Sequence, residues 1–340
     1  MALLFCDPIG LFYSTAAQAA SGLWTAFGGT IHTSGLPAGN VGSTAASFGP
    51  GGGAITVPSA AGPYTFGFRF VSTSAYTNDQ EICHLSDASN NSQVTCLTNS
   101  GGTITAKRGS GNGTVLGVSS GTNLLQNVWQ YIEFQVTVSA TVGTVAIRIN
   151  GATVLNLTGV NTLGGGGAAV IGKISIGSNL TNFFQDLYIA DSTGSYNNTF
   201  LGDVHVSVFN PTSNGTYTAY AANGAATLWQ SVSASTPADS TIFASDSTPG
   251  DRMSVNLASS SVTGTIAGVV NVGRMKKTDS GTRTAALTVT NNSVDSIGST
   301  ISLGTSYAYF TQVQETDPNT GVPWTNSGFN TTQVGVKTVS

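Results

Sequence analysis

The clearest structural signal in this chain is the stretch WQYIEFQVTVSATVGTVAIRINGATVLNL, residues 129–157. Apolar and polar side chains alternate over 132–138 and again over 145–149, which is the period of a half-buried β-strand. Asn150 and Gly151 follow, the pair that most readily adopts the positive φ of a two-residue hairpin turn. Residues 154–157 carry the next strand. The stretch therefore predicts an antiparallel sheet, and by itself it indicates no chemistry.

The composition is that of a folded protein with few charges. Charged residues make up 8% of the 340 residues, against about 25% in an average soluble protein, and 40% are hydrophobic. Disordered chains have the opposite balance. A surface of hydroxyls and amides costs far less to bury than one of ions, so we expect the chain to pack against copies of itself, with a trimer as the first expectation.

The charge distribution and the N-terminal sequence limit the partners. The formal net charge is −4, and the basic clusters at 107–108 and 274–277 have no aromatic residues between them, so nucleic-acid binding is not expected. No basic residue precedes Arg69, so an ordinary signal peptide is not expected. No window reaches the roughly 18 apolar residues of a membrane helix. We expect synthesis in the cytoplasm and no membrane insertion.

Short strands, recurring about every 8–12 residues, predict two all-β domains. The first domain is expected at 1–204 and a smaller β-sandwich at 205–340. Helical composition is confined to 13–23 and 121–128, and the Gly-rich segment 26–63 is predicted to carry few strands. The expected strands lie at 2–6, 64–70, 82–85, 94–97, 104–107, 115–118, 132–138, 145–149, 154–157, 171–176 and 184–190, and then at 216–221, 253–257, 266–272, 283–290, 300–303 and 307–313. The nearly continuous apolar run 264–272 predicts a strand buried on both faces.

The order of these strands resembles a known fold. An aromatic-rich strand at 64–70 is followed by the Trp-x-Tyr-x-Glu-Phe strand at 129–134, the hairpin at 145–151 and the Asp-Leu-Tyr-Ile-Ala-Asp strand at 186–191. This order is similar to that of the concanavalin A/laminin-G type jelly roll. The resemblance covers about residues 1–200, and it implies that 184–190 pairs with 2–6.

A narrower resemblance concerns the junction between the two domains. The runs 187–194 and 198–206, with the later Asp-Pro-Asn-Thr-Gly at 317–321, Trp324 and the ending 333–337, look like segments of tailed-bacteriophage virion proteins that carry a laminin-G-like domain. The chain departs from that pattern at 8–10, where Pro-Ile-Gly stands in place of Gly-Phe-Asp.

The resemblance implies a non-enzymatic structural component of the virion: a tail fibre, a tail-tip protein or a capsid-decoration protein. Its expected partners are other copies of itself, other virion proteins and a host-surface glycan. The alternative is a carbohydrate-active enzyme or a glycan-binding module on the same jelly-roll fold.

Few residues are candidates for catalysis. The three histidines, His32, His84 and His205, have no metal-ligand spacing, and no serine lies in a Gly-x-Ser-x-Gly motif. A glycosidase needs two carboxylates, and Glu133, the mid-strand candidate, has no partner acid on its strand. We therefore expect Glu133 to be exposed, opposite Arg148 across the hairpin, and the protein to have no enzymatic activity.

Calcium is the one cofactor that the sequence leaves open, since Asp186, Asp191 and Asp203 supply the oxygen ligands that it prefers. Against this, Asp186 and Asp191 bracket one expected strand, so we predict that both serve as turn residues at its ends. No cofactor is predicted.

The tryptophans and cysteines are the remaining candidates. Trp24 and Trp324 lie in polar loops and are the candidates for stacking on a sugar ring, whereas Trp129 is expected in the core. Cys83 and Cys96 either pair across two neighbouring strands or are free buried thiols, and the free form is favoured in a reducing cytoplasm.

Overall fold

The computed structural model describes residues 2–40, 44–177, 182–233 and 241–340. Within this part the chain divides into two compact units. Unit 1 comprises residues 1–20 and 24–206, and unit 2 comprises 21–23 and 207–340. The fold is all-β, as predicted: the two helices found in the described ranges, α1 (Ala16–Ala19) and α2 (Asn326–Phe329), have four residues each. Neither helix is long enough to cross a membrane.

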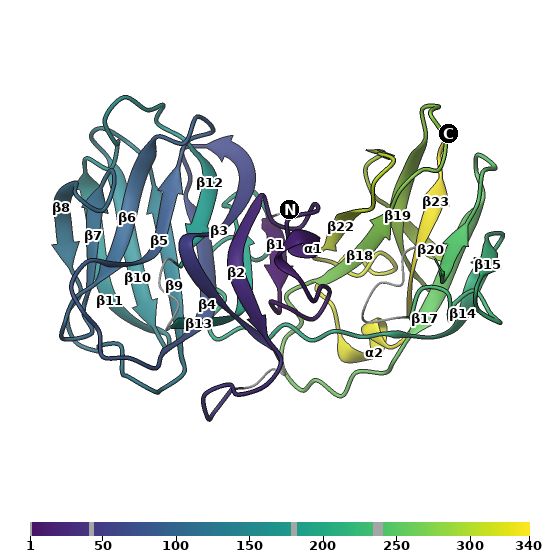
Figure 1. The fold of residues 1–340 in the computed structure, drawn as a ribbon, viewed down its shortest axis with the longest axis horizontal. Helices are drawn as coiled ribbons and strands as arrows, with labels where there is room; N and C mark the ends of the chain where they lie inside the picture. Colours follow the sequence, from purple (N-terminus) through teal and green to yellow (C-terminus); the bar gives the residue numbers. More distant parts are fainter. Residues whose placement is uncertain (1, 41–43, 178–181, 234–240) are drawn as a thin grey trace. The chain divides into compact units, whose positions relative to one another are not determined.

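Unit 1 is built on one antiparallel sheet that folds over on itself (Figure 1). Its path runs β11-β10-β9-β4-β13-β3-β12-β5-β6-β7-β8, with β1 added on β13 and β2 on β3. The strands are β1 (Leu3–Asp7), β2 (Ala26–His32), β3 (Ala45–Ala60), β4 (Tyr64–Ser72), β5 (Gln80–Ser86), β6 (Ser92–Thr98), β7 (Ile104–Arg108), β8 (Thr114–Val118), β9 (Gln130–Thr137), β10 (Gly143–Ile149), β11 (Ala152–Val160), β12 (Ile171–Ile176) and β13 (Asn182–Ala190).

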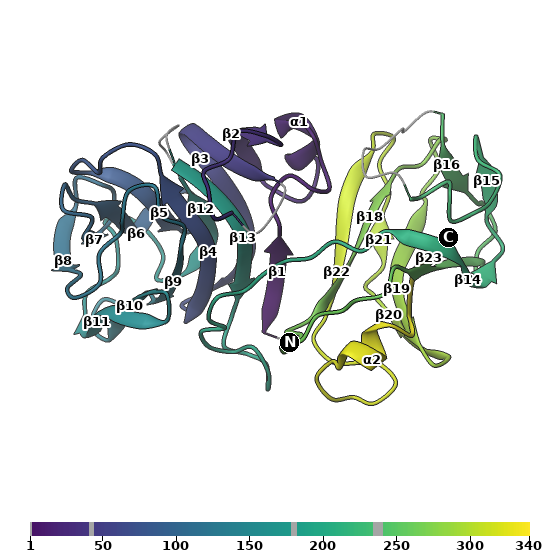
Figure 2. The same ribbon diagram turned by 90° about the horizontal axis from the view of Figure 1, so that it is seen from below.

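The two ends of the path meet, which makes the sheet a nearly closed sandwich. Strands β8 and β11 lie at the same end of unit 1 in both ribbon views (Figures 1 and 2), and Ser120 N, just after β8, donates to Val154 O of β11 at 2.9 Å. The core between the layers is aromatic, and Phe66 stacks on Phe134 with ring centroids 5.1 Å apart. Phe68 packs against Phe184 at 5.3 Å. The predicted alternation of β4 is confirmed, because its four aromatics all lie in the core.

The Gly-rich segment differs from its prediction, because 26–63 carries two strands. β3 is 16 residues long and pairs with β2, β13 and β12, so it joins the two halves of the sheet. Gly52, at φ +59°, lies within the strand in a backbone conformation that few other residues adopt. Small residues therefore indicate a close approach of strands here, and not a loop. The helix expected at 13–23 shrinks to α1, and 121–128 contains no helix.

The pairing of the first and last strands of unit 1 is confirmed. β1 runs antiparallel to β13, with Cys6 opposite Tyr188 and Asp7 opposite Leu187. The register of β13 against β4 shifts between Gln185 and Tyr188, which marks a β-bulge.

Unit 2 is a smaller β-sandwich. A six-stranded sheet, β14-β17-β23-β19-β20 with β21 on β19, packs against the two-stranded sheet of β18 and β22, and β15 pairs with β16. The strands are β14 (Pro211–Thr218), β15 (Ala221–Asn223), β16 (Phe243–Ser245), β17 (Arg252–Leu257), β18 (Val269–Met275), β19 (Thr284–Asn291), β20 (Val294–Ile297), β21 (Ile301–Ser302), β22 (Ala308–Gln314) and β23 (Thr332–Thr338). Val269, Val289, Trp324 and Phe329 form one part of its core.

One expectation for unit 2 is wrong, and one strand was not expected. The run 264–272 is not buried on both faces, because the strand starts only at Val269 and its buried and half-buried residues alternate at first. Sequence patterning also missed β23, which lies between β17 and β19 in the sheet. Polar residues such as Gln333 and Lys337 mask the alternation in β23. Backbone pairing with β17 and β19 sets its position in the sheet.

Candidate functional site

Unit 1 has one sheet face that is polar and yet buried. It is the side of β10, β9, β4 and β13 opposite the aromatic core, and we call it the polar face. Its side chains are those of Arg69, Tyr131, Glu133, Arg148, Asp186 and Tyr188. Glu133 is 1% exposed and Asp186 is 2% exposed. Charged residues are this deeply buried only where a specific arrangement holds them.

A glycine makes room for the aromatic part of this face. Tyr131 and Tyr188 lie parallel, with an interplanar angle of 7° and ring centroids 6.5 Å apart. Gly67 on β4 is opposite Glu133 on one side and Tyr188 on the other. A Cβ atom at Gly67 would come within 2.9 Å of both tyrosine rings and of the Glu133 side chain. The face therefore requires glycine at this position.

The segment 200–206, which we call the strap, covers the polar face. In its first half the backbone binds the face at two points: Leu201 N donates to the Tyr188 hydroxyl at 3.2 Å, and Gly202 N donates to Glu133 Oε1 at 2.8 Å. At the start of the strap, the Phe200 ring lies 4.1 Å from the Arg148 guanidinium, a cation–π distance.

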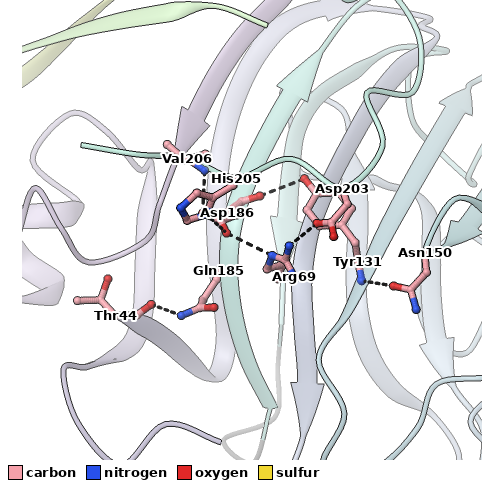
Figure 3. Close-up of polar contacts among 9 residues, drawn as sticks. All are labelled: Thr44, Arg69, Tyr131, Asn150, Gln185, Asp186, Asp203, His205 and Val206. Carbon is pink, nitrogen blue, oxygen red and sulfur yellow. Dashed lines mark hydrogen bonds and ion pairs between the residues drawn. The ribbon is translucent and has the colours of Figure 1, made fainter. Parts of the chain in front are cut away.

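The second half of the strap is held by charge (Figure 3). Asp203 Oδ1 accepts from Arg69 Nη2 at 2.7 Å, and Arg69 Nε lies 3.5 Å from Asp186 Oδ2. His205 Nδ1 is 3.0 Å from the same Oδ2, and Val206 N donates to Asp186 Oδ1 at 3.0 Å. One buried aspartate thus binds three groups, two of them on the strap.

Asp186 occupies an unusual backbone position. It lies at the bulge of β13 with φ +51°, which is uncommon for a residue other than glycine and marks a locally constrained conformation. Its carbonyl oxygen accepts a hydrogen bond from the Tyr131 hydroxyl at 3.1 Å. Burial raises the pKa of the Asp186 carboxyl, and the contacts with His205, Val206 and Arg69 lower it in part. The prediction that Asp186 ends its strand is wrong, since it lies within β13.

Glu133 also differs from its prediction. It is not exposed, because the strap covers it, and its Oε1 accepts from the Tyr188 hydroxyl at 2.7 Å. Arg148 is opposite Glu133 in register, as expected, but its guanidinium lies over the Phe200 ring. Within the described part of the chain, no ion pair joins the two, and Glu133 Oε2 has no hydrogen-bond partner.

The three candidate calcium ligands do not come together. Asp186 and Asp203 both contact Arg69, whereas Asp191 accepts from the backbone N and the hydroxyl of Thr193, at 2.9 and 2.7 Å. The described ranges contain no group of three or more His, Cys, Asp or Glu side chains that could hold a metal ion.

Both tryptophans predicted as sugar contacts are buried. Trp24 is 1% exposed, and its Nε1 donates to Asp7 Oδ2 at 2.7 Å. Trp324 is 4% exposed and donates to Gln314 O at 2.8 Å. Trp24 packs against the rings of Phe5, Phe27 and Phe48, and Trp324 belongs to the cluster of Val269, Val289 and Phe329, so neither indole offers a surface for stacking. Trp129 is only half-buried, so its assignment to the core is also wrong.

The basic cluster of unit 2 acquires aromatic neighbours that the sequence does not show. Arg274 lies 4.9 Å from the Tyr307 ring centroid and 5.2 Å from that of Tyr309, and Lys276 lies 4.5 Å from Tyr307. The pairing of β18 with β22 creates these contacts, because Arg274 is opposite Tyr309 in register. No local pattern could have revealed them.

Comparisons with known proteins give distant likenesses only. No family model matches the chain, and no curated protein does. Among solved structures, it is similar to a galectin from Caenorhabditis elegans, at 16% identity and a TM-score of 0.30, covering 41% of this chain and 90% of that one. It is also similar to an endo-β-1,4-glucuronan lyase from Trichoderma reesei, at 10% identity and a TM-score of 0.33, covering 48% and 87%.

A carbohydrate-binding module from Bacillus subtilis is a third likeness, at 14% identity and a TM-score of 0.30, covering 48% of this chain and 96% of that one. At these identities and TM-scores the likenesses assign no activity to this chain.

Proposed function

We propose that this chain is a non-enzymatic structural protein that acts by assembly, as a tail-fibre, tail-tip or capsid-decoration component of a tailed-phage virion. It would be made in the host cytoplasm and incorporated in the particle, with other copies of itself and other virion proteins as partners. The assignment to a tailed phage rests on the sequence resemblance of the 187–206 junction and of the C-terminal segment.

One observation supports the non-enzymatic part of the proposal. The acidic side chains that a glycoside hydrolase would need are engaged in holding the strap. Glu133 is 1% exposed beneath Gly202, and Asp186 binds His205 and Val206. A general acid must reach the bond that it protonates, which Glu133 does not do in this conformation.

The first test is the mass of the purified protein in solution, measured by light scattering after size exclusion. We expect a homo-oligomer, with about three times the chain mass of 34.4 kDa for a trimer. In parallel, the wild type and Glu133→Gln are incubated with a panel of bacterial polysaccharides. Turnover by the wild type that Glu133→Gln abolishes would overturn the proposal and establish the enzyme.

The polar face favours glycan binding as the second candidate function. Two parallel tyrosines flanked by Arg69 and Glu133 combine an apolar surface with hydrogen-bonding groups, as saccharide recognition requires. Because the strap occupies this face, binding there requires its displacement. Phe200→Ala should then bind glycans more tightly than the wild type on a glycan array, whereas unchanged or absent binding by both would eliminate this face as the site.

A further inference from the structure

Two cysteines of unit 1 face each other in the sheet. Cys83 on β5 and Cys96 on β6 are directly opposite in the antiparallel register. Opposite residues in such a ladder have Cα atoms about 4.5–5.5 Å apart, within the range that a disulfide bridges. Both side chains are fully buried, and both thiols are free.

The register that brings them together is fixed by packing on both sides. Ile176 of β12 is opposite Cys83, and Ala106 of β7 is opposite Cys96, so the two thiols belong to one row that crosses four strands. A slip of one residue would turn this row away from the core.

The turn that connects β5 and β6 is fixed as well. Asp87 Oδ1 accepts from the backbone N of Ser89 and of Asn91, at 2.9 and 2.8 Å, and Asp87 Oδ2 accepts from Asn91 Nδ2 at 2.9 Å. The same oxygen accepts from Ala168 N, which joins the turn to the segment before β12. The two sulfurs are therefore held close together before any reaction.

We propose that Cys83 and Cys96 are a thiol–disulfide modification site, which forms a cross-strand disulfide when the protein meets an oxidant such as glutathione disulfide. One thiolate attacks a sulfur of glutathione disulfide and releases one glutathione. The second thiolate then attacks the mixed disulfide and releases the other. Two protein thiols are oxidised and one glutathione disulfide is reduced to two thiols, so atoms and electrons balance.

Burial determines the rate of this reaction. Burial and the neighbouring Cys96 thiol raise the pKa of Cys83, so little thiolate is present in the closed hairpin. Oxidation must proceed through local opening of β5 and β6, which makes it slow. A protein made in a reducing cytoplasm would stay reduced there and oxidise after its release into an oxidising medium.

Cys6 provides an internal comparison. It lies on β1 opposite Tyr188, with no cysteine facing it in the sheet, and burial raises its pKa to about 12. It is not expected to form an intramolecular disulfide.

The test uses the full chain, purified with its thiols reduced. The protein is incubated with glutathione disulfide at a temperature where hydrogen exchange shows the amides of β5 and β6 opening within hours. Intact mass should fall by about 2 Da, the two hydrogens lost. Thiols titrated in denaturant should fall from three to one, and peptide mapping should link Cys83 to Cys96. The melting temperature should rise by roughly 5 °C and return on reduction.

Matched variants separate this outcome from unspecific oxidation. Cys6→Ser should show the same mass loss as the wild type. Cys83→Ser and Cys96→Ser should each gain one glutathione instead. The inference is overturned if the wild-type mass does not fall although the hairpin opens, or if mapping places the link at Cys6 or between chains. It does not depend on the proposed function, since it concerns unit 1 alone.

Discussion

Each unit places an arginine, an aspartate and a tyrosine together, and the aspartate pKa shifts in opposite directions in the two clusters. The clusters are Arg69, Asp186 and Tyr131 in unit 1 and Arg252, Asp295 and Tyr217 in unit 2. In unit 1 Arg69 Nε lies 3.5 Å from Asp186, whose side chain is 2% exposed, and burial raises the aspartate pKa. In unit 2 Arg252 Nη1 lies 2.7 Å from Asp295, whose side chain is 23% exposed, and the hydrogen bond from Arg252 lowers the aspartate pKa.

The difference shows that burial, and not residue type, decides what such a cluster does. The strap removes water from Asp186, so the desolvation of its charge outweighs the attraction of its partners. Asp295 lies on the edge strand β20 and keeps some water, so its hydrogen bonds dominate. The first cluster holds a segment in place against a free-energy cost, whereas the second stabilises its unit directly.

The largest loss of stability is expected from a side chain that does not fit within the polar face. Gly67→Ala should destabilise unit 1 by about 3 kcal/mol, because the new Cβ overlaps two tyrosine rings and Glu133. Chemical denaturation followed by tyrosine and tryptophan fluorescence measures this loss. The control is Gly165→Ala, where a Cβ meets nothing within 4 Å, and equal losses in the two variants would refute the steric account.

The second-largest loss of stability is expected from removing Arg69, which contacts both Asp186 and Asp203. Arg69→Met should cost roughly 2 kcal/mol, because Asp186 stays buried with one ionic partner fewer. The matched control is Arg283→Met, which breaks an exposed ion pair with Asp279 and should leave the stability almost unchanged. Similar losses in the two variants, measured by denaturant titration, would mean that burial does not separate these pairs.

The opposite pKa shifts predict opposite pH dependences. Asp295→Asn should cost about 1 kcal/mol at neutral pH, through the weakened contact with Arg252. The folded pKa of Asp295 is lowered, so its ionised form stabilises unit 2 above pH about 4, and this stabilisation disappears as the pH falls through the lowered pKa. The gap between wild type and variant should therefore close in acid.

For Asp186 the sign is reversed. Its folded pKa is raised, so the wild type should lose stability relative to Asp186→Asn as the pH rises from about 4 through the raised pKa. Thermal unfolding of both pairs of proteins between pH 3 and 7 measures these slopes. If the slopes had the same sign in both units, the comparison between the clusters would fail.

The smallest effect is expected from loosening one end of the strap. Phe200→Ala removes the ring from the Arg148 guanidinium and should cost about 0.5–1 kcal/mol. The loss should appear mainly as faster hydrogen exchange at Gly202 and faster proteolysis between 191 and 206, with the aromatic core of unit 1 unchanged. Protection of Gly202 at the wild-type level would show that Phe200 does not hold the strap.

Much of the fold of unit 1 follows from local pattern. The alternation over 64–70 and 132–138 gave strands β4 and β9, and Asn150-Gly151 gave the turn to β11. Local pattern did not predict the strands that lack alternation. β3 is rich in glycine and other small residues, and β23 is mostly polar. Their backbone pairing depends on neighbours distant in the sequence, which a local period does not encode.

The candidate site could be predicted less well. Glu133 was placed in a strand but expected to be exposed, Asp186 was expected at the end of a strand, and the sequence did not show that one segment covers both. From the sequence, Arg69 could be assigned only to the aromatic-rich strand 64–70, with no partner for its charge. The two tryptophans taken as surface candidates were misplaced, because local polarity does not show which groups close over an indole.

The strand periodicity, the low charge and the turn chemistry can be read from the residues and their immediate neighbours along the chain. That the strap lies on the polar face, that Asp186 is buried at a bulge and that Cys83 faces Cys96 follows only from the folded arrangement. These depend on register and coverage between segments far apart in the sequence, as the hydrogen bond between Gly202 and Glu133, 69 residues apart, illustrates. The physical reason is that the free energy of a charged or sulfur side chain is set by what excludes water from it, and local sequence does not specify that.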